Sequence, residues 1–455
     1  MATNSAVGLP LNVAPDLAAA WDAMCAPVRE RYAGSSPNRA RNLALRWLRW
    51  EVRRREGQAA PASGAALRVD ARILIVQPDH LGGVLASTPT FRLLKAALPT
   101  AKLTALVGPW GADVAERCPV VDRVRTCRFP AFDRAARPAG VLERVSSKLA
   151  PYTRLLDEAA ALRGERFDVA LVLAPDFWAA ALVALACIPR RVGFATAEAE
   201  GFLTYAMPMA PPPIGKAPGP REPGAAAQLR LARVALDMAG VAAPERFDAR
   251  MAYEPRPEER DAATRLWRAH DLDEAQGVVA LHPTPGGAAK RWPAERWALV
   301  ADHLSGRYGA QVVVTGGPHD VAEARALAAA CTRRPVVLAG QAPFGALAAL
   351  LERCRFVLGT DNGALHLATA RGVPSLRLFG QTDASVWGGW TGGGEQGPVT
   401  VALQSPRLCS PCHRLDLPLW EAVSPGHGAA YPCMEDLTLA AVLAAVEDLW
   451  RRTAR

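Results

Sequence analysis

Four short segments bring titratable residues and glycines together where an apolar run ends. The first segment, residues 77–88, reads QPDHLGGVLAST and places Asp79 and His80 beside Gly82 and Gly83. Glycines at such a turn let backbone amides approach an anion at the start of the following helix. A carboxylate or imidazole beside them could act as a general base. A plain turn with a capping aspartate would have the same sequence, so both interpretations stay open.

The second segment, residues 281–293, reads LHPTPGGAAKRWP and places a lysine just before a predicted helix. Lys290 is one of only five lysines in a chain that otherwise uses arginine. A flexible ammonium group suits a diphosphate whose charge grows as it leaves. The segment is not the GxxxxGK[ST] loop of nucleotide hydrolases, and a solvated lysine is the alternative interpretation.

The third segment, residues 358–372, reads LGTDNGALHLATARG, and the fourth, residues 378–390, reads LFGQTDASVWGGW. In the third, amides at the predicted helix start could bind a diphosphate, while Asp361 could bind sugar hydroxyls. His366 lies one turn into that helix, where a lone histidine is usually a satisfied core residue. The fourth contributes Thr382 and Asp383 and is weak by itself.

Apolar runs that alternate with helical periods connect these segments. The runs RILIVQ, KLTALV and DVALVLA predict one series of strands, and GVVALHP, QVVVTGG, PVVLAG, RFVLGTD and SLRLFG predict a second. Such alternation indicates parallel sheets covered by helices. We therefore expect an α/β protein with two Rossmann-like domains facing a central cleft, at residues 67–250 and 251–455. The site should lie at the carboxyl ends of the strands.

Residues 1–66 precede both series and are predicted to be a helical, basic extension followed by a linker. Helices are predicted at residues 16–32 and 38–56, and the second carries Trp47 and Trp50 among arginines. It is either an amphipathic helix lying on an anionic membrane or a helix packed on the first domain with a solvated basic face. Residues 208–224 are rich in proline and glycine, which predicts a linker or a substrate loop.

The composition, with 50% hydrophobic and 21% charged residues, is that of a soluble globular protein. A net charge of +9 favours an acidic partner. We expect no nucleic-acid partner, because the basic residues cluster mainly in the N-terminal helices and no binding motif appears. Neither a secretory signal nor a long apolar run is present, which predicts a cytoplasmic protein. Without GxGxxG after a strand, a dinucleotide oxidoreductase is disfavoured.

A weak candidate zinc site consists of Cys409, Cys412, His427 and Cys433, because a CxxC pair with further Cys and His residues offers tetrahedral ligands. The irregular spacing of the later residues favours free thiols, so we predict no metal. Nine scattered cysteines form no disulfide framework and suit a reducing compartment.

Taken in order, the four segments resemble those of the heptosyltransferase family, glycosyltransferase family 9. Leu81–Arg92 is similar to the family's L-G-D-V-L-x-T-x-P-A-L-R, and His282–Pro293 to H-P-G-A-x-x-x-x-K-R-W-P. Gly359–Pro374 is similar to G-x-D-S-G-x-x-H-L-A-A-A-x-G-x-P, and Phe379–Asp383 to F-G-x-T-D. The resemblance spans roughly residues 71–449 and implies the GT-B fold.

The resemblance implies an inverting, metal-independent and cofactor-free transfer of a sugar, typically heptose from ADP-heptose, onto a lipopolysaccharide core. The partners would be a nucleotide sugar and a lipid-linked or envelope saccharide. If the helix predicted at residues 38–56 lies on a membrane, the protein would be peripheral on the cytoplasmic face of the inner membrane. Lys290 would stabilise the leaving diphosphate. The donor-binding residues implied are Thr284, Lys290, Asp361, Asn362, Gly363, Ala364, Leu365, His366, Thr382 and Asp383.

One position departs from the family pattern. The family's catalytic base is the aspartate of L-G-D, and this chain has Gly83 there. Asp79 and His80 are the nearest substitutes, so these two and Lys290 are the catalytic candidates. If neither serves as the base, the chain would be a weak or inactive nucleotide-sugar-binding module in envelope assembly. A nucleotide-sugar epimerase with the same double Rossmann plan is a further alternative.

Overall fold

The computed structural model describes residues 39–56, 67–133, 141–196, 198–208, 221–392, 397–407, 410–412 and 431–454. The chain divides into two compact units, residues 1–61 and residues 62–455. In the smaller unit the described element is the helix α2 (Arg39–Glu56), which confirms the second predicted N-terminal helix. The helix predicted at residues 16–32 lies outside the described residues.

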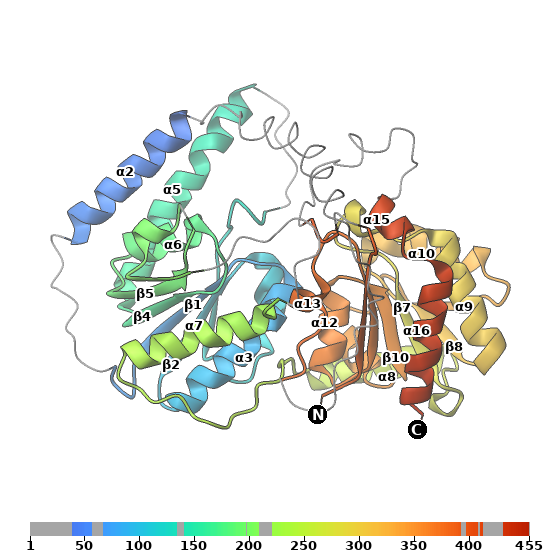
Figure 1. Ribbon diagram of the computed structural model, residues 1–455. Helices are drawn as coiled ribbons and strands as arrows, with labels where there is room; N and C mark the ends of the chain where they lie inside the picture. The colour runs from blue at the N-terminus through green and yellow to red at the C-terminus, as the bar shows by residue number, and fades with distance from the viewer. Residues whose placement is uncertain are drawn as a thin grey trace, which may run out of the picture. The chain divides into compact units, whose positions relative to one another are not determined.

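The larger unit contains two six-stranded sheets (Figure 1). In the first, the strand order is β3-β2-β1-β4-β5-β6, and all neighbouring strands are parallel. The central strand β1 is almost wholly buried, as expected when helices cover both faces of a sheet. The strands are β1 (Arg72–Gln77), β2 (Lys102–Val107), β3 (Arg123–Thr126), β4 (Val169–Val172), β5 (Arg190–Phe194) and β6 (Tyr205–Met207).

Helices α3 and α7 pack side by side on one face of this sheet, and α5 and α6 pack together on the other (Figure 1). The α3 helix follows β1 directly and so carries the first predicted site segment at its N-terminus. The helices are α3 (Leu81–Ala97), α4 (Ala112–Glu116), α5 (Val141–Glu165), α6 (Phe177–Leu185) and α7 (Gly224–Met238), with 3-10 turns η1 (Pro109–Gly111) and η2 (Glu200–Phe202).

The second sheet has the order β12-β11-β10-β7-β8-β9 and is also parallel throughout. Its strands are β7 (Val278–His282), β8 (Gln311–Val314), β9 (Val336–Val337), β10 (Phe356–Thr360), β11 (Ser375–Phe379) and β12 (Thr400–Gln404). The three remaining predicted segments follow β7, β10 and β11, which are neighbours in this sheet. Their carboxyl ends therefore meet at one edge.

The helices of this second half include α9 and α16, which pack against each other (Figure 1). They are α8 (Pro257–Ala269), α9 (Ala294–Tyr308), α10 (Val321–Ala330), α11 (Phe344–Leu351), α12 (Gly363–Ala370), α13 (Ala384–Trp387), α15 (Pro432–Glu435) and α16 (Leu439–Arg452). The 3-10 turns are η3 (Glu274–Gln276), η4 (Ala288–Lys290) and η5 (Pro318–Asp320). These two sheets with their helices confirm the predicted α/β fold class.

The segment between α7 and α8 joins the two halves and is held on both sides. Met251, Ala252 and Tyr253 are buried, and the Ala252 amide donates a hydrogen bond to Thr88 Oγ1 of α3 at 2.8 Å. The Tyr253 hydroxyl donates to Asp113 Oδ2 of α4 at 2.7 Å. We propose residue 250, at this segment, as the boundary between domains 67–250 and 251–455.

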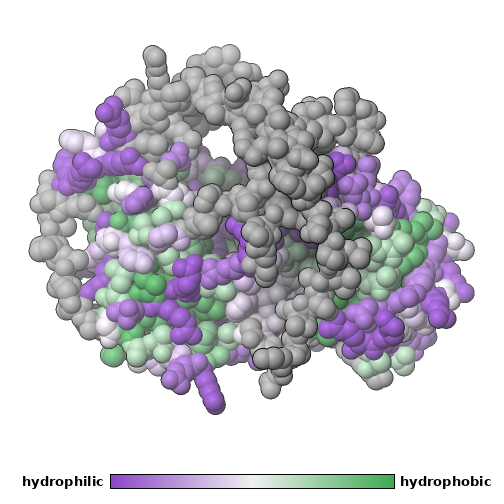
Figure 2. Space-filling view, in the orientation of Figure 1, coloured by the Kyte–Doolittle hydropathy of each residue, from purple (hydrophilic) through white to green (hydrophobic). Residues whose placement is uncertain are grey.

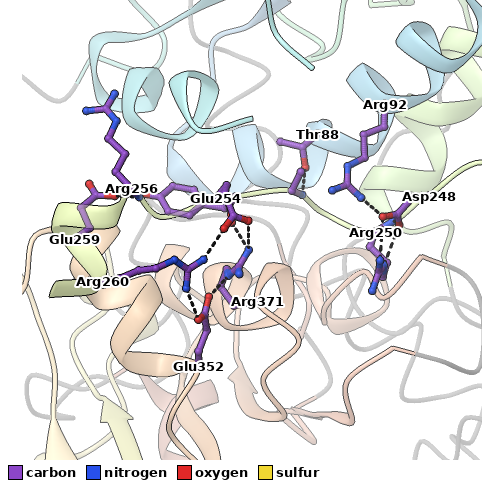
Figure 3. Close-up of polar contacts among 12 residues, drawn as sticks. Thr88, Arg92, Asp248, Arg250, Glu254, Arg256, Glu259, Arg260, Glu352 and Arg371 are labelled. Atoms are coloured by element: carbon purple, nitrogen blue, oxygen red, sulfur yellow. Dashed lines mark hydrogen bonds and ion pairs between the residues drawn. The ribbon is translucent and has the colours of Figure 1, made fainter. Parts of the chain in front are cut away.

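Charged residues fasten the same segment to the second half, as Figure 3 shows. Arg260 pairs with Glu254 at 2.5 Å and with Glu352 at 2.8 Å. Arg371 pairs with the same two carboxylates, at 3.1 Å to Glu254 and 2.5 Å to Glu352. Because each carboxylate is shared by two guanidinium groups, this network orients the end of α12 relative to the segment between α7 and α8.

Candidate active site

At the N-terminus of α3, the side chain of Asp79 lies against Gly83. The Cβ atom of Asp79 lies 2.6 Å from the position that a Cβ on Gly83 would take, and the Asp79 carboxylate overlaps that position. The Asp79 Oδ1 atom accepts a hydrogen bond from the His80 amide at 2.6 Å. A carboxylate at a helix N-terminus is favoured by the helix dipole. The absence of a side chain at residue 83 therefore makes room for the Asp79 side chain.

Two side chains fix the backbone around this carboxylate. The Trp110 Nε1 group donates to the carbonyl oxygens of Pro78 and Asp79, at 3.0 Å each. At the end of β1, Gln77 Nε2 donates to the Gly83 carbonyl at 3.2 Å. The turn is therefore tied to the strand on one side and to the Trp110 ring on the other.

His80, the other candidate base, has different surroundings. Its ring centroid is 5.3 Å from that of Trp110 and 6.4 Å from that of Phe132. The ring is partly exposed, and the residue occupies the N-cap position of α3 without a side-chain cap. The structure thus separates two residues that the sequence left equivalent: Asp79 occupies the space beside Gly83, and His80 joins an aromatic group.

The turn that carries Gly82 and Gly83, which is predicted to face the acceptor, contacts the first turn of α12, which is predicted to bind the donor. A Cβ on Gly82 would lie 2.9 Å from His366 Cδ2 in α12, and a Cβ on Gly363 would lie 3.2 Å from Leu81 Cβ. The N-termini of α3 and α12 therefore meet directly (Figure 1). This close approach accounts for glycine at both positions, and it places the segments predicted from two distant parts of the sequence in one site.

On the donor side, Asp361 is the centre of a small polar cluster. Lys290 Nζ donates to Asp361 Oδ2 at 2.5 Å, and Thr382 Oγ1 donates to the same oxygen at 2.9 Å. His366 Nε2 is 3.8 Å from Asp361 Oδ1. Although burial opposes ionisation, Lys290 and His366 hold the pKa of Asp361 below its ordinary value. Burial lowers the pKa of His366, which favours a neutral imidazole.

Several buried polar atoms around this cluster have no hydrogen-bond partner among the described residues. Thr284 Oγ1, Thr360 Oγ1 and Gln381 Oε1 belong to this group, as does His366 Nδ1. Thr284, Thr360 and Gln381 lie at the carboxyl ends of three neighbouring strands, β7, β10 and β11. Buried polar groups usually have hydrogen-bond partners in folded proteins. A cluster of buried polar atoms without partners at one sheet edge therefore indicates a ligand site.

Two backbone amides in the first turn of α12 already donate hydrogen bonds to the N-cap residue, Asn362. Asn362 Oδ1 accepts hydrogen bonds from the amides of Ala364 and Leu365, at 3.0 and 3.2 Å. These amides were expected to bind a diphosphate directly. An anion at this turn would share the amides with Asn362 or displace its side chain, because the same donors serve both.

Asp383 serves as the N-cap of α13. Its Oδ1 atom accepts from the Ser385 amide at 2.8 Å and from the Ser385 hydroxyl at 2.6 Å. Its other oxygen lies 3.6 Å from Arg221 Nη1. Arg221 was not predicted as a site residue, because it lies within the proline- and glycine-rich segment at residues 208–224. That composition does not indicate which other segments its residues contact.

Arg377 is a second residue that the sequence did not single out. It lies on β11, is fully buried, and donates to the Leu365 carbonyl at 2.6 Å and to the Thr369 hydroxyl of α12. Burial lowers its pKa to about 10, which leaves it charged at neutral pH. This cation beneath α12 adds to the positive potential of the donor side. The available signal was a single arginine within the apolar run SLRLF.

The weak zinc candidate falls largely outside the described residues, because Cys409 and His427 are not among them. Cys412 and Cys433 are described and buried. Within the described ranges, no group of three or more Cys, His, Asp or Glu side chains has an arrangement that could hold a metal ion.

A cavity of about 480 Å³ lies along the segment between α7 and α8, and not at the turn between β10 and α12. Its lining includes Arg92, Arg250, Tyr253, Arg371 and Trp390. None of the predicted catalytic or donor-binding residues lines it. The candidate site therefore rests on the meeting of α3 and α12 and on the polar atoms there, not on this cavity.

Parts of this chain are similar in sequence to known proteins. Residues 156–413 match the model of glycosyltransferase family 9 (heptosyltransferase). A lipopolysaccharide heptosyltransferase 3 of Escherichia coli is 35% identical over 127 residues, which are 27% of this chain and 37% of that protein. The chain thus spans little more than a third of that curated relative.

Two solved structures share the fold over more of the chain. A family 9 glycosyltransferase from Veillonella parvula superimposes with a TM-score of 0.62 and 21% identity, covering 85% of this chain and 99% of that one. The E. coli heptosyltransferase WaaC, solved with ADP, gives a TM-score of 0.54 and 20% identity, covering 83% of this chain and 99% of that one.

Proposed function

The chain belongs to glycosyltransferase family 9, the heptosyltransferases, and from that premise we propose that it transfers a heptose from ADP-heptose to a saccharide of the lipopolysaccharide core. ADP is the nucleotide with which the related WaaC was solved, and lipopolysaccharide heptosyltransferase is the name of the related E. coli enzyme. We propose that the transfer inverts the anomeric centre and needs no metal.

The donor would bind at the carboxyl edge of β7, β10 and β11. Lys290 supplies the positive charge for the diphosphate, and Arg377 beneath α12 reinforces it. The Thr284 hydroxyl and the His366 Nδ1 atom, both buried and without partners among the described residues, would bind polar atoms of the donor. Asp361, held ionised by Lys290, would accept hydrogen bonds from sugar hydroxyls.

The acceptor hydroxyl would approach from the α3 side. Its oxygen attacks the anomeric carbon on the face opposite the diphosphate, the bond from that carbon to the diphosphate oxygen breaks, and ADP leaves with the bonding electrons. The proton of the hydroxyl passes to a general base. We propose that Asp79 is this base, and the observation that carries the proposal is the overlap of its carboxylate with the side-chain position of residue 83.

The turnover experiment uses the purified full-length chain with a panel of nucleotide sugars, including ADP-heptose. Release of ADP is measured with and without lipopolysaccharide core lacking the heptose. We expect release that depends on the acceptor and persists after treatment with a metal chelator. Conversion of the donor sugar without acceptor would instead indicate an epimerase.

The binding-module alternative arises from the same Gly83. It predicts that ADP-heptose binds, as calorimetry would show, while no acceptor in the panel leads to ADP release. Binding together with acceptor-dependent release would exclude it, since a pure binding module leaves the sugar–diphosphate bond intact.

A further inference from the structure

The N-terminal helix α2 has two unlike sides. Leu48 and Val52 are almost completely buried, with 0% and 2% of their surfaces exposed. Trp47 and Trp50 are exposed by 44% and 58%, and they are two of the five large hydrophobic residues exposed to that degree among the described residues. Because indole rings normally bury most of their surface, two exposed tryptophans one turn apart indicate an unpartnered face.

The exposed tryptophans share their face with arginines. The exposed side chains are those of Arg46, Trp47, Trp50, Arg53 and Arg54. At 100° per residue, these five positions fall within one third of the helix circumference, because they are related by spacings of three, four and seven residues. The guanidinium carbon of Arg54 lies 5.9 Å from the Trp50 ring centre. Cationic and aromatic side chains are therefore interleaved on this face.

The charge of α2 is unusually concentrated. Its 18 residues contain seven arginines and two glutamates, which gives +5 of the chain's total of +9. Glu51 is buried and pairs with Arg54 at 2.7 Å and with Arg55 at 2.5 Å. The hydrogen bond from Arg54 is the main reason that the pKa of Glu51 falls to about 2. Among the described side chains of α2, no carboxylate lies on the exposed face.

We propose that this face of α2 docks on the surface of an anionic lipid bilayer. Tryptophan rings prefer the headgroup level of a membrane, and arginines bind lipid phosphates on either side of them. Helix α2 would lie in the plane of the surface. None of the described helices is both long and apolar enough to cross a membrane. The proposal rests on α2 alone and stands whether or not the transferase reaction is as proposed.

A bilayer fits this face better than a nucleic acid does. Proteins that bind single strands without sequence preference usually stack bases on aromatic side chains along a groove that follows the backbone. On α2 the two tryptophans instead stand on the convex side of a helix, between arginines. Such a surface can contact a plane, where the indole rings enter the headgroup layer and the guanidinium groups remain at the phosphates.

The test is cosedimentation of the full-length protein with vesicles. Pure phosphatidylcholine vesicles are compared with vesicles containing about one third phosphatidylglycerol, in about 0.1 M salt and again in about 0.5 M salt. We expect binding to the anionic vesicles in low salt, with several-fold weaker binding in high salt. We expect little binding to the neutral vesicles.

Two α2 variants and two matched controls separate the face from the rest of the surface. Arg46→Gln/Arg53→Gln/Arg54→Gln should weaken binding to anionic vesicles on the order of 100-fold, and Trp47→Ser/Trp50→Ser should weaken it by at least about tenfold. Arg451→Gln/Arg452→Gln changes two arginines of α16 that are 76% and 50% exposed, and Leu299→Ser changes a residue of α9 that is 51% exposed. Both controls should bind as the unaltered protein does.

Three results would overturn the proposal. The first is equal binding to neutral and anionic vesicles, and the second is undiminished binding by both α2 variants while circular dichroism shows them folded. The third is failure to bind anionic vesicles in low salt. If the protein instead binds single-stranded RNA in an α2-dependent way, the face is assigned to nucleic acid.

Discussion

The carboxylate of Asp79 lies where the side chain of residue 83 would begin, within the first turn of α3. Residue 83 is the position at which related enzymes are expected to carry their catalytic aspartate, and here it is glycine. The turn therefore still holds one carboxylate, supplied from four residues earlier. The two arrangements exclude each other, because an aspartate at 83 and the present conformation of Asp79 require the same space.

Replacing Gly83 by alanine should reduce turnover without unfolding the protein. The new methyl group would overlap the Asp79 carboxylate and would also lie 2.6 Å from the Asp79 Cβ atom. The carboxylate must therefore rotate away, and the backbone of the turn must shift as well. We expect kcat to fall at least about tenfold and the free energy of unfolding to fall by about 1 to 3 kcal/mol, which leaves the protein folded. Gly306→Ala is the matched control, since nothing lies within 4 Å of its new Cβ. A Gly83→Ala enzyme with unaltered kcat would argue against this role of the turn.

Replacing Thr284 by valine should weaken ADP binding but not the fold. The Thr284 hydroxyl is buried without a partner among the described residues, so removing it leaves no protein group unsatisfied. We expect a five- to tenfold higher Kd for ADP by calorimetry, with the free energy of unfolding unchanged or slightly higher.

Thr88→Val provides the contrast for that measurement. The Thr88 hydroxyl donates to the Leu85 carbonyl at 2.7 Å and accepts from the Ala252 amide at 2.8 Å. Its loss should cost about 1 to 3 kcal/mol of stability and leave the affinity for ADP intact. If Thr284→Val behaved like Thr88→Val, the Thr284 hydroxyl would be a structural group and not a ligand contact.

Lys290 should contribute mainly to the departure of the diphosphate. Lys290→Gln is expected to lower kcat about 100-fold or more, and Lys290→Arg should retain part of the activity because it keeps the charge. Lys95→Gln is the control, since Lys95 pairs with Asp122 at 2.9 Å on the surface. Steady-state kinetics with saturating acceptor separates the effect on kcat from that on KM. A kcat that Lys290→Gln leaves unchanged would remove the lysine from the mechanism.

Asp361 should stabilise the protein in a pH-dependent way. Lys290 and His366 hold its pKa below the ordinary value, so the ionised form contributes stability that is fully present above the unfolded-state pKa of about 3.9. That contribution is lost as the pH falls toward the lowered folded-state pKa. Asp361→Asn should therefore cost about 1 to 3 kcal/mol at neutral pH, and the difference from the unaltered protein should shrink below about pH 4. Urea unfolding from pH 7 to pH 3 tests this; a difference independent of pH would contradict it.

The regular elements of the fold were largely predictable, because their hydrophobic patterns are strong. The run AERWALVADHLSGRY is helix α9 (Ala294–Tyr308), and RILIVQ is β1 (Arg72–Gln77). Weaker patterns were missed or overestimated. Strand β3 reads RVRT at an exposed edge, where no apolar pattern is required, and PVVLAG gave only the two-residue strand β9.

The segments that form the site could be predicted from the sequence, but the contacts between their side chains could not. Sequence reasoning placed Lys290 and Asp361 on the donor side, and the structure joins them at 2.5 Å. It could not choose between Asp79 and His80, because that choice depends on the side-chain conformation and on the Trp110 ring, which comes from the end of a different strand. The capping of α12 by Asn362 was also missed, because the same sequence is compatible with an asparagine that caps the helix and with one that binds a ligand.

Turnover of the Asp79→Ala variant, compared with that of Asp79→Gly/Gly83→Asp, decides whether the carboxylate beside residue 83 is the general base. We predict that the single variant loses about 100- to 10,000-fold in kcat for acceptor-dependent release of ADP. The double variant, which removes the Cβ atom of residue 79 together with its carboxylate and places a carboxylate at residue 83, should recover at least about tenfold of that loss. His80→Asn, measured alongside, should retain most of the activity. If Asp79→Ala turns over as fast as the unaltered protein, the carboxylate beside Gly83 is not the base and the account is wrong.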